Sequence, residues 1–202
     1  MNIEIKISKR LIPYTLASKF LQKRVDSLKR GKGRGLIWIL EHPISYTSGV
    51  RGVKEDILDK KIKIIKTNRG GKITLHSPGQ KIVYFALNIS KKKDIRKFVN
   101  KIESCIIKLL KKYKIKGNND KENIGVWVKE KKIAAIGIRV SRWIAFHGCS
   151  INLNNNLKLY AKINPCGLDS KNITTVEKEI GFVPKDFEKE LVKIFKKDFS
   201  YY

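Results

Sequence analysis

Two hydrophobic periodicities alternate along this chain of 202 residues. Apolar residues occupy every second position in residues 3–7, as in a strand, and recur at helical spacing over residues 14–28. A further strand is predicted at residues 36–40, which are all apolar. Interleaved strands and helices bury their apolar faces on one another, so the sequence predicts an α/β or α+β fold, a mixed sheet with flanking helices.

The rest of the chain continues this alternation. A second amphipathic helix is predicted at about residues 94–113, and Pro184 is suited to open a last one. Strands are predicted at residues 61–67, 82–89 and 142–153, and as a hairpin of 126–128 with 133–136 around a charged turn at 129–131. The glycine-rich residues 31–35 precede a strand and are predicted to form a turn. No repeat or linker interrupts the pattern, so we expect a single domain over residues 1–202.

The formal net charge of +27 raises nucleic acid as a partner, because clustered lysine and arginine neutralise phosphates. The basic residues are spread along the whole chain, however, and no zinc-finger spacing, aromatic RNA-binding signature or helix-turn-helix stands out. Codon bias in an AT-rich genome produces such a spread, and nucleic acid is not the expected partner. A strongly acidic protein partner would also suit this charge, since complementary fields raise association rates.

Neither a membrane span nor an export signal is predicted. The longest apolar runs, residues 36–40 and 82–87, are far shorter than the roughly 20 residues of a membrane-spanning helix. Residues 1–7 alternate and include an acid, whereas a signal peptide has a continuous apolar segment. The odd number of cysteines favours reduced thiols. We therefore expect a soluble, cytoplasmic protein.

The cysteines and histidines do not form a metal-binding pattern. His147 and Cys149, taken with Cys166, lack a paired Cys-x-x-Cys, and the other histidines do not lie at ligand spacing. Cys105 lies beside the apolar face of the second predicted helix, where a thiol packs as a small hydrophobe. Neither a metal nor a cofactor is expected.

Cys166 is placed for chemistry. Pro165 fixes the backbone before it, and Gly167 leaves room for another molecule to approach. Lys132 stands at the mouth of an apolar predicted strand, whereas the neighbouring Lys131 falls in the charged turn. A thiol and a possible proton partner suggest acyl transfer through a cysteine thioester. The residues alone also allow a structural cysteine beside a turn and a lysine without a special role.

Residues 69–80 contain glycines whose backbone N–H groups can approach a ligand closely. Arg69 precedes two of them, and Pro78 with Gly79 closes the segment with a turn. The same pattern fits a plain hairpin between the strands predicted at 61–67 and 82–89. His76, within it, is either a histidine at the edge of the core or a hydrogen-bond donor to a carbonyl.

Several motifs, in this order and spacing, resemble the lipoyl(octanoyl) transferases. The resemblance covers roughly residues 14–180. The matching motifs are EHP at 41–43 with YT at 46–47, RGGKITLHSPGQ at 69–80, GVWV at 125–128, KIAAIGIRV at 132–140, FHGCSINLN at 146–154 and INPCGL at 163–168. The chain departs from the family pattern at Leu75, where the family usually has tyrosine, and at Ser77, where it usually has glycine.

This resemblance implies the fold of biotin and lipoate protein ligases. It implies transfer of octanoyl from octanoyl-acyl carrier protein to a lysine of lipoyl domains, those of the 2-oxoacid dehydrogenase E2 subunits and the glycine cleavage H protein. Carried over by position, Cys166 is the thioester nucleophile and Lys132 the residue that lowers its pKa. The residues implied to contact the substrate are Arg69, Gly70, Gly71, Lys72, Ile73, Thr74, Leu75, His76, Ala135, Ile136, Gly137, Gly148, Cys149 and Ser150.

Two alternatives remain open at this point. An ATP-dependent lipoate or biotin ligase of the same fold activates a free acid as an adenylate and has no need of the cysteine. A basic nucleic-acid-binding module has no catalysis at all. Transfer between thioesters requires no ATP, because one thioester is exchanged for another before the more stable amide forms.

Overall fold

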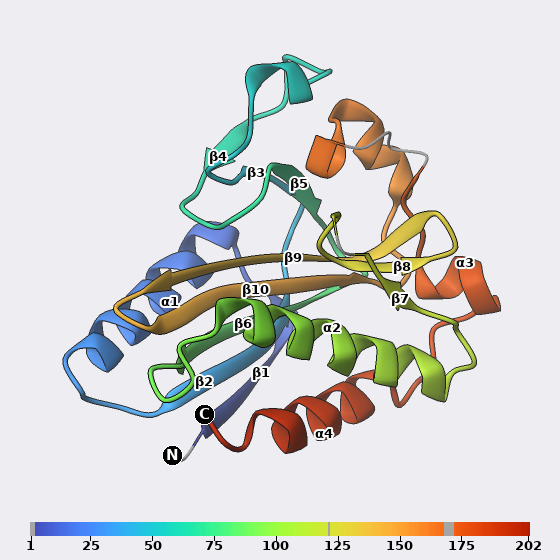
Figure 1. Cartoon of the computed structure of the whole chain (residues 1–202). Helices are drawn as coiled ribbons and strands as arrows, with labels where there is room; N and C mark the ends of the chain where they lie inside the picture. Colours follow the sequence, from blue (N-terminus) through green and yellow to red (C-terminus); the bar gives the residue numbers. More distant parts are fainter. Residues whose placement is uncertain (1–2, 121, 168–171) are drawn as a thin grey trace.

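A mixed sheet of seven strands forms the centre of the molecule (Figure 1). The computed structural model describes residues 3–120, 122–167 and 172–202, except the side chain of Cys166. The strand order is β1-β2-β6-β10-β9-β8-β7; β1 and β2 are parallel, and the other neighbours are antiparallel. The strands are β1 (Ile3–Leu11), β2 (Gly35–Glu41), β6 (Gln80–Asn88), β7 (Asn118–Asn119), β8 (Val126–Val128), β9 (Lys131–Ser141) and β10 (Ile144–Asn152).

Helices cover both faces of this sheet, which confirms the predicted fold class. α1 (Tyr14–Lys29) packs on one face, against Leu36 and Trp38 of β2. α2 (Ile95–Lys112) and α4 (Phe187–Phe199) pack together on the other face, against Ile37 and Ile39. Successive residues of β2 thus point to opposite faces, and both faces are buried, which explains the uninterrupted apolar run of this strand. No helix among the described residues is long and apolar enough to cross a membrane.

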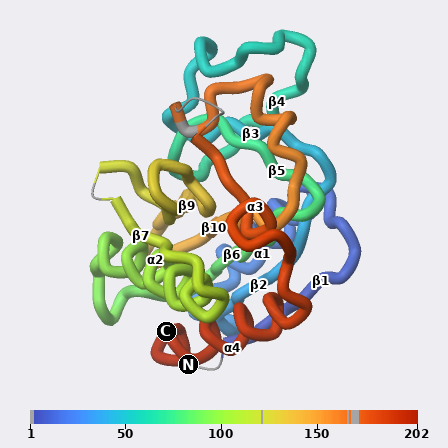
Figure 2. The backbone as a smooth tube through the Cα atoms, turned by 90° about the vertical axis from the view of Figure 1, so that its right-hand side faces the viewer, coloured from blue at the N-terminus to red at the C-terminus, as the bar shows by residue number. Residues whose placement is uncertain are grey.

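A small second sheet lies beside one end of the large one (Figures 1 and 2). Its strand order is β4-β3-β5, with β3 at Ser45–Ser48, β4 at Ile64–Lys66 and β5 at Ile73–His76. The alternative of a plain hairpin between residues 61–67 and 82–89 is therefore excluded, because β4 pairs with β3 and β6 belongs to the large sheet. Short 3-10 helices complete this part, among them η1 (Lys54–Asp56), η2 (Leu157–Lys162) and η3 (Pro165–Gly167).

Capping and turn residues fix several boundaries of these elements. Asp94 caps α2, since its carboxylate accepts a hydrogen bond of 2.8 Å from the backbone N–H of Lys97. The strand predicted at 142–153 begins only at Ile144, because Arg142 and Trp143 have positive φ angles of 49° and 60°. Two such residues form the tight turn that joins β9 to β10. The short helix α3 (Val176–Ile180) precedes α4, which starts three residues after Pro184.

The charged turn before β9 is shorter than predicted. Lys129 takes a positive φ of 54°, and Lys131 is already the first residue of β9. The prediction that Lys131 belongs to the turn is wrong, while Lys132 lies inside the strand as predicted.

Candidate active site

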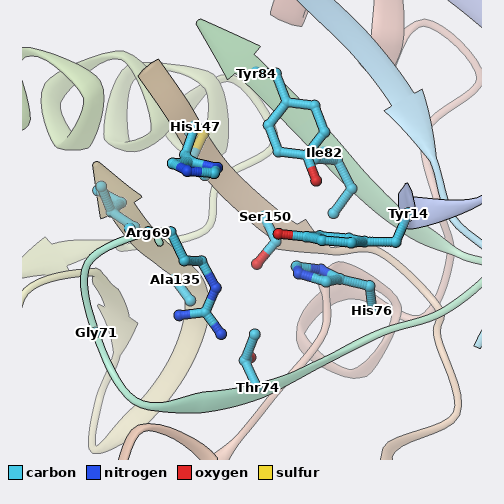
Figure 3. A pocket seen from close by; sticks show the side chains of 14 residues that line it. Tyr14, Arg69, Gly71, Thr74, His76, Ile82, Tyr84, Ala135, His147 and Ser150 are labelled. Atoms are coloured by element: carbon cyan, nitrogen blue, oxygen red, sulfur yellow. The ribbon is translucent and has the colours of Figure 1, made fainter. Parts of the chain in front are cut away.

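A narrow pocket of about 50 Å³ lies where the two sheets meet, and we call it the inner pocket (Figure 3). Its walls come from α1, β5, β6, β9 and β10 and from the segment before β5. The lining residues are Tyr14, Arg69, Gly71, Thr74, His76, Ile82, Tyr84, Ala135, Ile136, Gly137, His147, Gly148, Cys149 and Ser150. Most of the residues implied by the family resemblance are therefore brought together around one cavity.

The segment of Arg69 lies directly against strand β9. A Cβ on Gly137 would come within 2.9 Å of the carbonyl oxygen of Gly70, and one on Gly70 within 2.8 Å of that of Ile138. Any other residue type at these two positions would push the segment away from the strand. Close backbone approach therefore requires glycine here and closes one wall of the inner pocket.

The guanidinium of Arg69 is held at this wall by backbone and side-chain oxygens. It donates hydrogen bonds to the carbonyl oxygen of Thr47 at 2.8 Å, to the Oγ1 of Thr47 at 2.9 Å and to the carbonyl oxygen of Gly70 at 3.0 Å. Only 9% of Arg69 is exposed. A fixed positive charge of this kind lies beside the cavity and favours neutral or negative groups within it.

All three histidines of the chain lie in or beside the inner pocket. Burial lowers the pKa of His76 to about 3, with smaller contributions from His42 and Arg69. Burial likewise lowers the pKa of His42 to about 4 and that of His147 to about 3, the latter helped by Arg69 and Arg139. The imidazoles are therefore neutral at pH 7 and act as hydrogen-bonding groups.

Hydrogen bonds and ring contacts fix the orientation of two of these imidazoles. Nδ1 of His76 lies 2.9 Å from Oε1 of Gln80, and Tyr14 stacks on the His76 ring at 5.7 Å between centroids. Figure 3 shows these two rings lying parallel along one side of the pocket. Nε2 of His42 lies 2.8 Å from the hydroxyl oxygen of Tyr84. The aromatic side of the pocket is thus rigidly built.

A wider cleft of about 520 Å³ adjoins the inner pocket, and we call it the outer cleft. The two cavities share Gly71, Ile136 and Gly137 as lining residues. The remaining lining residues of the cleft are Arg51, Gly70, Lys72, Ile95, Val99, Glu122, Asn123, Ile124, Lys132, Ile138 and Gly167. A ligand seated across Gly137 can therefore reach both cavities.

Lys132 lies at the start of β9 in the outer cleft and is only 5% exposed. Its ammonium donates a hydrogen bond of 3.1 Å to the carbonyl oxygen of Ile124 and lies 4.6 Å from the centre of the Trp127 ring. Lys131, one position earlier, points to the exposed side. Strand alternation therefore buries only one of the two lysines in the cleft.

The backbone of Cys166 lies in η3, and its thiol lies outside what the structure describes. Gly167, the next residue, lines the outer cleft, with a positive φ of 76°. A Cβ there would lie 2.6 Å from the Nζ of Lys72. The backbone on which Cys166 stands therefore borders the cleft that also holds Lys132.

Two residues of the implied set line neither cavity. Ile73 and Leu75 alternate with Thr74 and His76 along β5, and their side chains pack in a core cluster with Tyr160. The expectation that these two residues contact a substrate is not matched by their position. The departure at Leu75 from the family pattern accordingly falls in the core, and Ser77, the other departure, is also buried.

The two other cysteines are poorly suited to nucleophilic chemistry. Cys149 lines the inner pocket, but burial raises the pKa of its thiol far above the ordinary range. Burial, and to a smaller extent the nearby Asp198, also raises the pKa of the Cys105 thiol far above the ordinary range. Among the described residues, no group of three or more histidines, cysteines and acids could hold a metal ion.

A third cavity, also of about 520 Å³, lies on the far side of Tyr14 and His147, and we call it the side cavity. Both residues line the inner pocket as well. The other lining residues are Thr15, Ser18, Lys19, Leu21, Gln22, Ile65, Lys66, Thr67, Asn68 and Phe146. The family resemblance did not imply several of the residues that line these cavities. In the inner pocket these are Tyr14, His147, Ile82 and Tyr84, and in the outer cleft they include the residues of α2 and of 122–124.

The sequence and the fold match a known class of catalytic domain. The family model of the lipoyl protein ligase A/B catalytic domain matches residues 13–196, and the chain belongs to this family. A putative lipoate protein ligase from Thermoplasma acidophilum, solved with bound lipoic acid, superimposes with a TM-score of 0.77 at 14% identity, covering 99% of this chain and 87% of that one. At that identity the likeness concerns the fold alone.

Sequence relatives narrow the class. An octanoyltransferase of a Wolbachia endosymbiont of Brugia malayi is 40% identical over 203 residues, covering 98% of each chain. The octanoyltransferase of Anaplasma phagocytophilum is 39% identical over 207 residues, covering 96% of this chain and all of the relative. Within the family the chain therefore belongs to the octanoyltransferases, which are acyltransferases.

Proposed function

We propose that this enzyme transfers an octanoyl group from octanoyl-acyl carrier protein to a lysine of lipoyl domains. The acceptors would be the lipoyl domains of 2-oxoacid dehydrogenase E2 subunits and the glycine cleavage H protein. The observation that carries the proposal is the union of a narrow inner pocket, walled in part by Ile82 and Ala135, with a cleft that holds Lys132. Relatives named octanoyltransferase, at about 40% identity over nearly the whole chain, support the acyl group chosen.

The first step proposed is thioester exchange at Cys166. The thiolate attacks the octanoyl carbonyl carbon, the bond from that carbon to the carrier's sulfur breaks, and the carrier thiol leaves with the proton that Cys166 gave up. A free thiol, with a pKa of about 8.5, is only a few per cent thiolate at neutral pH. The ammonium of Lys132, in the cleft that the backbone of Gly167 borders, would favour the thiolate.

The second step proposed is attack by the acceptor amine on the octanoyl-cysteine thioester. The amine nitrogen forms the amide, the bond from carbon to the sulfur of Cys166 breaks, and Lys132 relays the amine proton to that sulfur. Backbone N–H groups near Gly70 and Gly71, or around Cys166, are candidates for stabilising the tetrahedral oxyanion. The amide is more stable than the thioester, so no nucleotide is needed.

We also propose that residues 1–202 work as one catalytic domain. The inner pocket takes walls from β5 of the small sheet and from β6, β9 and β10 of the large sheet. Neither sheet alone would enclose it. A location in the cytoplasm, where an acyl carrier protein would meet the enzyme, remains a prediction.

The test is incubation with octanoyl-acyl carrier protein, without nucleotide, followed by intact mass and peptide mapping. We expect a single octanoyl adduct on Cys166, discharged by added lipoyl domain, and no adduct in Cys166→Ala. An adduct on Cys105 or Cys149, or turnover by Cys166→Ala, would refute the assigned nucleophile. Attachment of free octanoate that requires ATP and magnesium would establish the alternative of an ATP-dependent ligase. Binding of nucleic acid without any acylation would establish the alternative of a nucleic-acid-binding module.

A further inference from the structure

A buried carboxylate and the ammonium of Lys132 bind opposite ends of the same peptide group. The N–H of Gly125 donates a hydrogen bond of 3.1 Å to Oε1 of Glu103, on α2. The carbonyl oxygen of Ile124 accepts a hydrogen bond of 3.1 Å from Nζ of Lys132. This N–H and this carbonyl belong to the one peptide unit that joins Ile124 to Gly125. Glu103 and Lys132 are thus linked through a single rigid, polarisable plane.

The burial of Glu103 costs free energy unless its carboxylate makes compensating interactions. Among the described residues, only Asp56 and Glu103 are buried acids, and Glu103 is 3% exposed. Its neighbours on the buried face of α2 are apolar, among them Ile102 and Ile106. Burying a carboxylate is costly without compensating partners, and a hydrophobic residue of similar volume in such a place is often neutral or stabilising.

The bridging peptide is held in an orientation that only glycine allows at its second residue. Gly125 has a φ of 142°, and a Cβ there would lie 2.6 Å from the carbonyl oxygen of Ala134 and 3.1 Å from Cε of Lys132. The segment therefore lies directly on the side chain of Lys132. A change in the tilt of this peptide moves the oxygen to which the ammonium is bonded.

We propose that Glu103 is a positioning residue for Lys132, acting through the Ile124–Gly125 peptide. Its carboxylate orients the peptide by accepting the N–H, and this polarises the carbonyl that holds the ammonium in the outer cleft. This inference rests on the role proposed above for Lys132. Other charges that face Lys132 are Asp120, which interacts with it electrostatically, and Arg51, Lys72 and Glu122 across the cleft.

Two variants separate the orientation from the charge. In Glu103→Gln the amide oxygen can still accept the N–H of Gly125, but the negative charge is lost. In Glu103→Leu both are lost while the volume is nearly kept. Asp120→Asn is the matched control, since Asp120 is exposed and its neutralisation removes the same charge without the peptide link.

The measurements are the pH dependence of alkylation at Cys166, read by peptide mapping, and the steady-state constants of octanoyl transfer. For Glu103→Gln we expect near-normal transfer and an alkylation midpoint lowered by roughly half to one pH unit, because the positive charge of Lys132 is then no longer offset by the negative charge of Glu103. For Glu103→Leu we expect kcat to fall at least about tenfold with KM for the donor unchanged, because Glu103 lines neither cavity.

Asp120→Asn should leave both readouts near those of the wild type, since its charge is screened by solvent. An unchanged alkylation midpoint in Glu103→Gln, or an activity loss in Glu103→Leu that merely follows a loss of folded protein, would overturn the proposal. The role of Lys132 itself is checked separately with Lys132→Met: if alkylation and transfer do not change there, the proposed function fails independently of Glu103.

Discussion

Nε2 of His147 lies 2.6 Å from Oδ1 of Asn68, and this contact holds the imidazole between the inner pocket and the side cavity. His147 has a positive φ of 65°, which is uncommon for a residue inside a strand. Tyr14 is the other residue that lines both cavities. The two side chains form the partition that ends the inner pocket on this side.

This partition is expected to limit the length of the acyl chain. His147→Gly removes the ring and suits the positive φ, so it should join the two cavities without straining the backbone. Each further methylene buried contributes about 0.8 kcal/mol, and decanoyl has two more than octanoyl. We expect the ratio of kcat/KM for decanoyl over octanoyl carrier protein to rise roughly tenfold.

Thr15→Ala is the control for this change, because Thr15 lines the side cavity alone. Its chain-length profile should equal that of the wild type. If His147→Gly also keeps the wild-type profile while it still transfers octanoyl, the acyl chain ends elsewhere and the partition has no part in specificity.

Acidification should destabilise the fold through the buried histidines. The pKa values are about 4 for His42 and about 3 for His76 and for His147, below the value of about 6.5 expected in the unfolded chain. The unfolded state therefore takes up protons first as the pH falls below about 6.5, and stability is progressively lost until the folded pKa values are reached.

The expected loss at pH 5 relative to pH 7.5 is about 2 kcal/mol for each fully neutral histidine. Denaturant unfolding of the wild type and of His76→Gln at both pH values measures it. The variant should lose about 2 kcal/mol less than the wild type on acidification, whatever its stability at pH 7.5. An equal loss in both proteins would show that His76 is not neutral in the fold or not coupled to it.

The sequence predicts the layered fold because two periodicities are each sustained long enough to be distinguished. The alternation in β1 directs Ile3 and Ile5 to the core on one face of the large sheet, and the helical spacing of α1 gives this helix an apolar face that packs on the other. The sequence could not decide between a plain hairpin and a ligand-binding segment at residues 69–80. Pairing of β4 with β3 is a contact distant in sequence, and local patterns carry no information about it.

Only part of the candidate site could be predicted from the sequence. Thr74 and His76 face the inner pocket, while Ile73 and Leu75 enter the core, as the polar and apolar alternation of this strand allows. His147 reaches the pocket through a backbone angle that no periodicity signals. Tyr14 lies on the apolar face of α1, for which the sequence predicts burial in the core. Its contact with the pocket becomes apparent only from the packing of α1 on the sheet.

Lys132 is buried and its neighbour Lys131 is exposed, so substitutions at these two positions form a matched pair. Lys132→Met should shift alkylation of Cys166 to higher pH and slow octanoyl transfer by orders of magnitude, because the ammonium would stabilise the thiolate and then relay the acceptor's proton. Lys131→Met should change little, since its side chain points away from the cleft. Peptide mapping of alkylation rates across pH gives the answer, and identical profiles for the two variants would refute the role of Lys132.

Salt tests whether the formal charge of +27 serves catalysis. If acidic carrier and lipoyl domains are drawn to the basic surface, the field acts chiefly on the association rate. Exposed charges are screened over about 10 Å at 0.1 M salt, so kcat/KM for octanoyl-acyl carrier protein should fall steeply between low and moderate salt. Alkylation of Cys166 by a small neutral reagent involves no long-range attraction and should change far less. If both rates stay flat, the lysines lie on faces remote from the cleft and have no steering role, while the catalytic assignment is unaffected.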